Sequence, residues 1–210
     1  TICSGTSSTI MTLSTSNSVA STTFAWSRDN GTLSSGNVTG IAASGTGNIP
    51  AATLVNTTSS PVTVTFTIIP TGPSPTFCVG NSITTAIVVN PRPVGSATAQ
   101  SICNGATTNV ALNSTVSGTT FTWAASLLSG NISGANSCAS ACGTTIAQTL
   151  NSTSTGVERY TVTPAANGCS GTAFTVDVTV SRPPVITTSP TGGTVCLGSP
   201  INLSVVATGP

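Results

Sequence analysis

Residues 174–180 read Phe-Thr-Val-Asp-Val-Thr-Val, and this stretch indicates the type of fold most directly. Large apolar side chains alternate with Thr and Asp at a period of two, which is the pattern of a β-strand with one buried face. Residues 83–89 carry a matching alternation, with Ile, Thr, Ile and Val expected on the inner face. Both stretches run into proline-containing segments, Pro91–Val94 and Arg182–Val185. Because proline fixes φ and lacks an N–H donor, these segments are predicted to end the strands and to form short, stiff linkers.

A cysteine followed two places later by glycine marks the start of a unit that occurs three times. The three tetrapeptides are Ile-Cys-Ser-Gly at residues 2–5, Ile-Cys-Asn-Gly at 102–105 and Val-Cys-Leu-Gly at 195–198. We call Cys3, Cys103 and Cys196 the opening cysteines. Two further Cys-x-Gly segments contain Cys78 and Cys169, which we call the closing cysteines. The opening cysteines lie 100 and 93 residues apart, a domain-sized interval that indicates a tandem array.

The repeat divides the chain into residues 1–93, residues 94–184 and the start of a third, truncated repeat at residues 185–210. No segment shows a convincing period of 3.6 residues, so no helix is predicted. Short strands are broken by Gly, Pro, Asn and Ser at intervals of about ten residues, which favours an immunoglobulin-like sandwich. The predicted fold class is therefore all-β, with tandem antiparallel β-sandwiches joined by short proline-rich linkers.

Each whole repeat contains one aromatic pair, Phe24 with Trp26 and Phe121 with Trp123. The spacing of two residues places both rings of a pair on one face of a strand. We predict that these rings fill the space between the two sheets of a sandwich, as large aromatic side chains commonly do. A tryptophan that stacks on a sugar ring is the alternative.

The composition excludes some classes of partner. Ser and Thr account for 73 of the 210 residues, there is no Lys or His, and the formal net charge is +1. Nucleic-acid binding needs clustered Lys and Arg, so no nucleic-acid partner is predicted. No apolar run reaches the roughly 18 residues that a membrane-spanning helix needs, and we predict no membrane insertion. β-branched, hydroxyl-rich strands are typical of an extracellular β-protein.

Catalytic and metal sites are not predicted. Without His the usual general base is missing, and the carboxylates Asp29, Glu158 and Asp177 are isolated in the sequence and expected to be solvated. The chain is therefore not expected to be an enzyme or to bind a cofactor. Calcium takes about six to eight oxygen ligands, usually including several carboxylates, so only a site of backbone carbonyls remains as an alternative.

The combined pattern resembles the PKD-like and immunoglobulin-like repeats of Bacteroidota surface proteins, including the very large mobile adhesins of gliding flavobacteria. The resemblance rests on Ile-Cys-x-Gly, Phe-x-Trp, Gly-Cys-x-Gly, a Thr/Val-rich last strand and Pro-x-Pro-Val, and it covers both whole repeats and the third start. It implies a β-sandwich, export by the type IX secretion route and display on the cell surface, with no catalytic residues. The sequence departs from this pattern before Cys78, where Phe77 replaces the glycine and the stretch Thr71–Pro75 is unusually proline-rich, and at the insertion that contains Cys138 and Cys142.

The seven cysteines indicate an oxidising compartment, and we predict the pairs Cys3–Cys78, Cys103–Cys169 and Cys138–Cys142, with Cys196 unpaired. A zinc site at Cys138 and Cys142 would need two more ligands nearby, so a small disulfide loop is favoured. The rival scheme joins each closing cysteine to the next opening cysteine. A strand and a proline linker would carry those partners tens of ångströms apart, beyond the about 7 Å that a disulfide allows between Cα atoms.

The function expected from these observations is structural. The chain would be a spacer or stalk segment of a large bacterial cell-surface adhesin, involved in surface adhesion and gliding motility, with neighbouring repeats of the same chain as its partners. The alternative is that the repeats themselves bind polysaccharide or a solid surface through Thr-rich faces.

Overall fold

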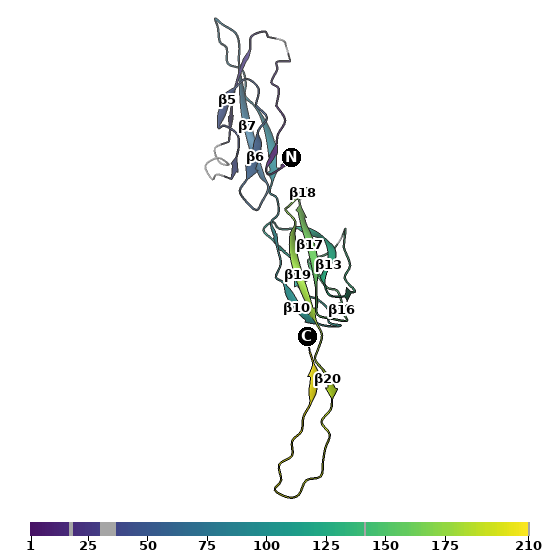
Figure 1. Cartoon of the computed structure of the whole chain (residues 1–210). Coiled ribbons are helices and arrows are strands. Elements are labelled where there is room, and N and C mark those ends of the chain that lie inside the picture. The colour runs from purple at the N-terminus through teal and green to yellow at the C-terminus, as the bar shows by residue number, and fades with distance from the viewer. Residues whose placement is uncertain (17–18, 30–36, 141, 210) are drawn as a thin grey trace. The chain divides into compact units, whose positions relative to one another are not determined.

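The structure is a computed structural model that describes residues 1–16, 19–29, 37–140 and 142–209 (Figure 1). Every regular element in these residues is a β-strand. The all-β class of tandem immunoglobulin-like sandwiches is confirmed. The chain forms two compact units, of which the first consists of Thr1–Val94, Ser114–Thr119 and Pro164–Thr172, and the second of Gly95–Asn113, Thr120–Thr163 and Ala173–Pro210.

The first repeat contains two layers of strands. Its described strands are β1 (Ile2–Cys3), β2 (Thr6–Ser7), β3 (Thr23–Arg28), β4 (Val38–Thr39), β5 (Ser44–Thr46), β6 (Thr53–Asn56), β7 (Val62–Thr71) and β8 (Ile83–Asn90). One sheet has the order β1-β8-β7-β3-β5, and the other has the order β2-β6-β4. The two long central strands, β7 and β8, pair antiparallel from Val62↔Val89 to Ile68↔Ile83.

The second repeat has the same plan. Its described strands are β9 (Gly95–Ser96), β10 (Gln100–Cys103), β11 (Val110–Ala111), β12 (Asn113–Ser114), β13 (Thr120–Ser129), β14 (Ile132–Ser133), β15 (Thr145–Ile146), β16 (Asn151–Ser152), β17 (Gly156–Ala166), β18 (Cys169–Ser170) and β19 (Phe174–Ser181). The main sheet has the order β10-β19-β17-β13, and β18 adds to β17. The short pairs β11–β15, β14–β16 and β9–β12 complete the repeat.

The period-two patterns place the core where the sequence predicts it, with one exception. In β19 the side chains of Val176, Val178 and Val180 are buried, while the residues between them are half-buried. In β8 the alternation holds toward the end of the strand, but Ile83 is 58% exposed. Ile83 lies on the predicted inner face, opposite the buried Ile68, but it is not part of the buried cluster.

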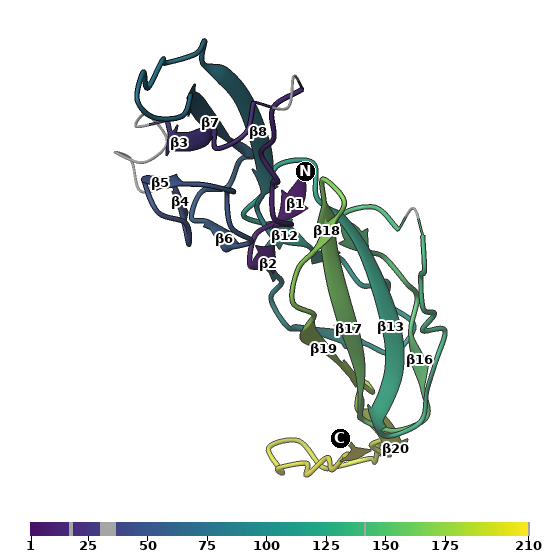
Figure 2. The same cartoon turned by 90° about the horizontal axis from the view of Figure 1, so that it is seen from above.

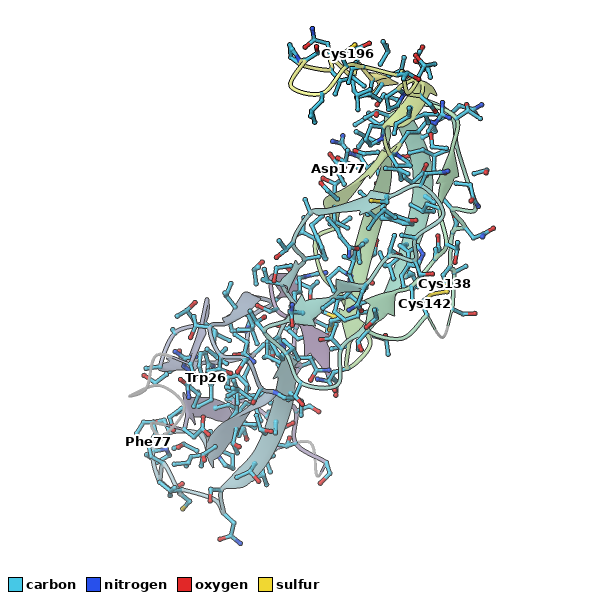
Figure 3. All side chains as sticks on the ribbon, turned by 90° about the horizontal axis from the view of Figure 1, so that it is seen from below. Trp26, Phe77, Cys138, Cys142, Asp177 and Cys196 are labelled. Carbon is cyan, nitrogen blue, oxygen red and sulfur yellow. A yellow bond between two sulfur atoms is a disulfide. The ribbon has the colours of Figure 1, made fainter. Side chains whose placement is uncertain are left out.

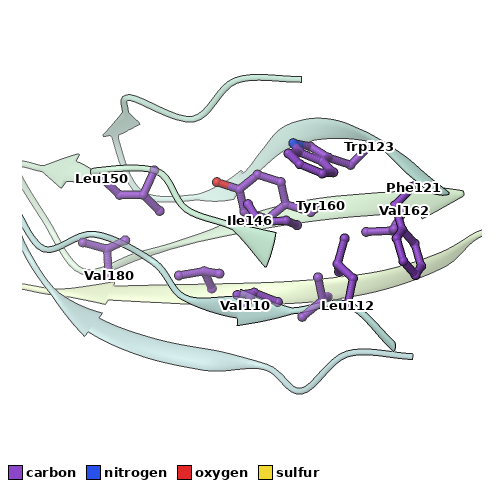
Figure 4. Packing of buried hydrophobic residues seen from close by; sticks show 11 residues of the cluster. Val110, Leu112, Phe121, Trp123, Ile146, Leu150, Tyr160, Val162 and Val180 are labelled. Carbon is purple, nitrogen blue, oxygen red and sulfur yellow. The ribbon is translucent and has the colours of Figure 1, made fainter. Parts of the chain in front are cut away.

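The cores lie between the two layers of each repeat, and the predicted aromatic pairs contribute to them. In the second repeat, Val110 and Ile146 of one layer pack with Phe121, Trp123 and other residues of the opposite sheet (Figure 4). In the first repeat, Trp26 is 5% exposed and meets Phe66 edge to face, with ring centroids 6.0 Å apart. Phe24 is only half-buried at the margin of that core.

The first strand of each repeat pairs in parallel with the last strand, although the other long pairings in the main sheets are antiparallel. In the first repeat Cys3 lies opposite Asn90, and in the second Cys103 lies opposite Ser181. Cys3 and Cys103 are therefore each held beside the residue at which the chain leaves the sandwich. This placement determines which cysteines can meet.

Beyond the second repeat, β20 (Val185–Thr188) and β21 (Val206–Thr208) form an antiparallel pair. The residues between them extend as a long loop (Figure 1), and Ile201, Leu203 and Val205 are about half exposed. Their apolar alternation matches the start of the earlier repeats, as expected for the beginning of a third one.

Candidate functional site

The feature of greatest functional interest is a disulfide between Cys3 in β1 and Cys169 in β18. Figure 2 shows these two strands. Both residues belong to the first compact unit, and their Cα atoms lie 5.6 Å apart. The bond joins residues 166 positions apart, one opening cysteine and the closing cysteine of the following repeat. The predicted pairs Cys3–Cys78 and Cys103–Cys169 are thus not formed; Cys78 and Cys103 are free and exposed.

The parallel first strand explains why those two predictions are wrong. Cys3 lies opposite Asn90 at the end of β8, whereas Cys78 precedes the start of that strand at Ile83. Seven residue steps at about 3.3 Å per residue separate the two ends of β8 by roughly 23 Å, far more than the about 7 Å that a disulfide allows between Cα atoms. The same argument separates Cys103 from Cys169 across β19.

The small insertion forms the disulfide that the sequence indicated there. Cys138 and Cys142 are bonded, with Cα atoms 5.8 Å apart (Figure 3). The backbone of Cys138 exchanges two hydrogen bonds with Trp123, so the loop is held against the aromatic strand. Cys196, in the loop after β20, is exposed and unpaired.

An arginine of the first linker, Arg92, holds the two segments around the Cys3–Cys169 disulfide. Arg92 donates from Nε to the carbonyl of Ser4 at 2.9 Å and from a terminal nitrogen to the carbonyl of Ser170 at 2.7 Å. Each acceptor directly follows one of the bonded cysteines. Hydrogen bonds from an ionised donor are stronger than neutral ones, so the guanidinium reinforces the disulfide. Asn90 adds a 2.7 Å bond from its side-chain amide to the carbonyl of Asn167.

A glycine makes the close approach of these segments possible. A Cβ added at Gly171 would lie 1.8 Å from the carbonyl oxygen of Pro93, a distance that real Cβ atoms do not show. At Cys169 the glycine of the Cys-x-Gly pattern is therefore required because a side chain at residue 171 would clash with Pro93. In the sequence, the Arg92-Pro93 dipeptide of the linker is the signal for these contacts.

Beside Arg92 lies a shallow recess of about 350 Å³, bounded by Ser4, Pro91 and residues 57–59. Its walls carry hydroxyl groups and one guanidinium, which are donors suited to a polar, uncharged or anionic ligand. A similar recess of about 570 Å³ borders Arg182 and residues 153–155 in the second unit.

A family model for the PKD-like domain matches residues 1–93 and 100–184. The chain belongs to the PKD-like domain family. PKD-like domains are a non-catalytic type of module, and disulfides in such domains are typical of extracellular proteins. No curated protein matches the sequence.

Several solved structures of tandem β-sandwich domains are similar to the PKD-like chain. A titin structure of three immunoglobulin domains, an E-to-A mutated variant, has a TM-score of 0.45 at 13% identity, covering 100% of this chain and 72% of that chain. The human CDH23 EC21-23 structure has a TM-score of 0.38 at 12% identity, with coverages of 98% and 80%. The Ig1-2 module of the Drosophila receptor protein tyrosine phosphatase DLAR has a TM-score of 0.28 at 9% identity, with coverages of 85% and 92%. At these TM-scores the similarities carry no inference about function.

The carboxylates of the PKD-like chain are not simply solvated, contrary to expectation. Asp177 accepts two hydrogen bonds of 2.8 Å from the guanidinium of Arg159, its partner across β17 and β19. This pairing holds the pKa of Asp177 below its ordinary value and raises that of Arg159. The pair lies on the outer face and is about one third exposed, so its contribution to stability is modest.

Glu158 is the unusual ionisable residue of the second PKD-like repeat. It is 3% exposed on the inner face of β17, at the position that Val64 occupies in the first repeat. Burial raises the pKa of its carboxyl group because the charged form loses its hydration. The pKa of nearby Tyr160 is raised to about 12 by burial and by the charge of Glu158, and its hydroxyl donates to Gln148 at 2.9 Å.

These carboxylates do not form a metal or catalytic cluster. Within the described ranges, no group of three or more His, Cys, Asp or Glu side chains could hold a metal ion. In the same ranges, no helix is long and apolar enough to span a membrane.

Proposed function

We propose that the chain is a stalk segment of a large bacterial cell-surface adhesin, in which PKD-like repeats act as spacers. The observation that carries this proposal is the disulfide between Cys3 and Cys169, which closes a loop across most of two tandem repeats. A spacer has to resist extension when a distant binding tip is pulled. A cross-link between distant residues provides that resistance without any ligand.

The mechanical effect follows from the length of chain that the bond encloses. A fully extended chain gains about 3.3–3.6 Å per residue, so the 166-residue separation corresponds to roughly 550 Å of extension that the disulfide withholds. The parallel pairing of β1 with β8 adds a row of backbone hydrogen bonds at the same end of the first repeat. Arg92 then links the segments on either side of the sulfur atoms.

Further parts of the proposal concern the parent protein. We assign residues 1–93 and 94–184 as whole repeats and residues 185–210 as the start of a third. The parent would be displayed at the cell surface after type IX secretion and would serve adhesion and gliding motility, as in Bacteroidota adhesins of the SprB type. The support is the cysteine pattern, the Thr-rich last strands and the extracellular type of module.

Single-molecule stretching of this chain tests the spacer role. The chain would be held at Thr1 and at the C-terminal residue and pulled under oxidising and then reducing conditions. We expect reduction to lengthen the fully unfolded chain by roughly 550 Å, the length enclosed by the Cys3–Cys169 loop. The Cys138→Ser variant is the control, because its four-residue loop withholds almost no length. Equal contour lengths before and after reduction would exclude this mechanism.

Direct binding of polysaccharide or a solid surface is the second candidate function. It is favoured by the hydroxyl-lined recesses beside Arg92 and Arg182. A glycan array and adsorption to solid surfaces would be measured with the wild-type chain and with the Arg182→Ala variant. Binding that the variant loses would establish this function, and no binding by either chain would leave the spacer role.

A further inference from the structure

Two of the three opening cysteines, Cys3 and Cys103, occupy equivalent positions in their repeats. Cys3 lies opposite the last residue of β8, and Cys103 lies opposite the last residue of β19. The next residue donates its amide to that same last residue at 2.8 Å in both repeats. The glycine that follows donates to Leu54 in the first repeat and to Leu150 in the second, again at 2.8 Å. The backbone therefore presents both cysteines in the same way.

The two closing cysteines, Cys78 and Cys169, are equivalent by the same criterion. The glycine two places after each cysteine donates its amide to a proline carbonyl, at 2.9 Å for Gly80 and 2.8 Å for Gly171. A Cβ added to either glycine would lie 3.0 Å from the ring of that proline. Only the loop before the cysteine differs, because it is longer in the first repeat.

Cys3 and Cys169 are bonded to each other, whereas their equivalents Cys103 and Cys78 are free and exposed. The surroundings of the two closing cysteines also differ. Gly171 is covered by the carbonyl of Pro93, whereas the three atoms nearest to a Cβ built on Gly80 all belong to Pro70. Val79 is 70% exposed beside Cys78, an unusual exposure for a large apolar residue between a cysteine and a glycine. The end of the first repeat that contains Cys78 thus has the features of a surface that is covered in the second repeat.

We propose that Cys103 and Cys78 are the open halves of a staggered series of disulfides, in which the opening cysteine of each PKD-like repeat bonds the closing cysteine of the next. Cys103 would form a disulfide with the cysteine of a Gly-Cys-x-Gly segment in a repeat that follows it. Cys78 would form a disulfide with the cysteine of an Ile-Cys-x-Gly segment in a repeat that precedes it. Two observations support this proposal. Cys103 and Cys78 have free thiols, and the residues equivalent to them, Cys3 and Cys169, form such a bond.

The linker arginine reinforces the disulfide that is formed. Arg92 bonds the carbonyls that follow Cys3 and Cys169. Arg182 does not repeat this arrangement: it directly follows the last residue of β19, whereas Arg92 lies two places after the last residue of β8, and it donates to the carbonyl of Thr153 at 3.0 Å. This inference holds whether the array is a spacer or binds a ligand.

The bond forms by ordinary thiol–disulfide exchange. The thiolate of Cys103 attacks a disulfide of low molecular weight, such as oxidised glutathione, and releases one glutathione thiol. The closing cysteine then attacks the mixed disulfide and releases the second. Two thiols of the protein are oxidised, one disulfide of the reagent is reduced to two thiols, and both protons pass to the leaving thiolates.

The test uses an extended chain in which residues 94–184 are inserted a second time after residue 184. The exposed Thr172 of the inserted copy is changed to Ser, so that the peptide with its closing cysteine is recognised by mass. The extended chain and the 210-residue chain are refolded with reduced and oxidised glutathione, digested with pepsin at acid pH and mapped without reduction. We expect Cys103 to be bonded to the closing cysteine of the inserted copy, and to be a free thiol in the 210-residue chain.

A second extended chain tests the other half. Residues 94–193 are placed before Thr1, because residue 194 corresponds to Thr1 in the repeat, and Cys78 is expected to bond the opening cysteine of the added repeat. The Cys103→Ser variant of the first extended chain is the control, in which the inserted closing cysteine should react with a maleimide. The proposal is overturned if Cys103 stays free while Cys3–Cys169 forms, if Cys103 bonds Cys169 or a cysteine of a second chain, or if Cys3–Cys169 does not form.

Discussion

Glu158 is the residue whose environment conflicts most with its chemistry. Its carboxyl group is buried on the face where the first repeat carries Val64, and its pKa is raised by burial. The folded state therefore binds this proton more tightly than the unfolded state does. The stabilising effect is complete below the ordinary pKa of 4.5 and is lost as the pH rises through the raised value.

We therefore expect Glu158→Gln to raise the free energy of unfolding at neutral pH by about 1–3 kcal/mol, the usual order for relieving a poorly solvated polar group. The gain should disappear at acid pH, where the carboxyl is protonated. Denaturant unfolding between pH 3 and pH 8 would measure it. Asp177→Asn is the matched control with the opposite sign: the pKa of Asp177 is lowered, so its contribution is present above 3.8 and lost as the pH falls. Because this pair is partly exposed, that loss should be about 0.2–1 kcal/mol.

Trp123 is the residue that distinguishes a core from a sugar-binding platform. It is 7% exposed, and its indole N–H donates to the carbonyl of Asn136 at 3.1 Å. Trp123→Ala should lower the free energy of unfolding by about 3–5 kcal/mol, as removing a large buried ring does. Thermal unfolding followed by tryptophan-independent far-UV circular dichroism measures this change. Unchanged thermal stability together with lost glycan binding would instead support the sugar-stacking alternative.

Among the elements, the β17–β18 hairpin shows how a glycine, Gly171, allows the backbone of Pro93 to approach closely. The position of Gly171 is sterically closed by Pro93, whereas Gly80 in the equivalent hairpin is open on that side. Neither glycine is marked by a positive φ, so the difference between them is a matter of space alone.

Gly171→Ala should therefore destabilise the chain by about 1–3 kcal/mol, the usual cost of overpacking. It should also slow formation of the Cys3–Cys169 disulfide during refolding. Gly80→Ala is the matched control: it introduces the same proline contact at 3.0 Å without the Pro93 contact, so it should destabilise the chain less and should not slow the disulfide. Quenching free thiols during refolding and measuring unfolding in urea would compare the two variants; equal effects would show that the Pro93 contact is unimportant.

At the scale of the whole molecule, the long disulfide is the largest single constraint on the unfolded chain. By the chain-entropy relation, a loop of 166 residues contributes about 5 kcal/mol, while the four-residue loop of Cys138 and Cys142 contributes about 2 kcal/mol. Cys3→Ser should therefore lower the thermal midpoint more than Cys138→Ser. Differential scanning calorimetry under oxidising conditions would check the order, and the two variants should become equal to wild type after full reduction.

The sequence by itself determined the class of fold, because alternation with a period of two needs only the local geometry of a strand and one buried face. It also determined that the aromatic pairs reach the core and that the cysteines recur in register. It could not show that Ile83 stays exposed, since alternation indicates which face a side chain occupies and not whether other residues pack over it. Nor could it show that Glu158 is buried, because a single carboxylate in a strand does not reveal which face it occupies.

The partners of the cysteines were decided only by the tertiary structure. Sequence distance suggested that a repeat closes on itself, from Cys3 to Cys78. The first strand instead pairs in parallel with the last, and this places the opening cysteine at the opposite end of the sandwich from the closing one. A strand of eight residues is too long for a disulfide to cross. Cys3 therefore bonds Cys169, because strand direction, which no local pattern encodes, decides which ends of the chain can meet.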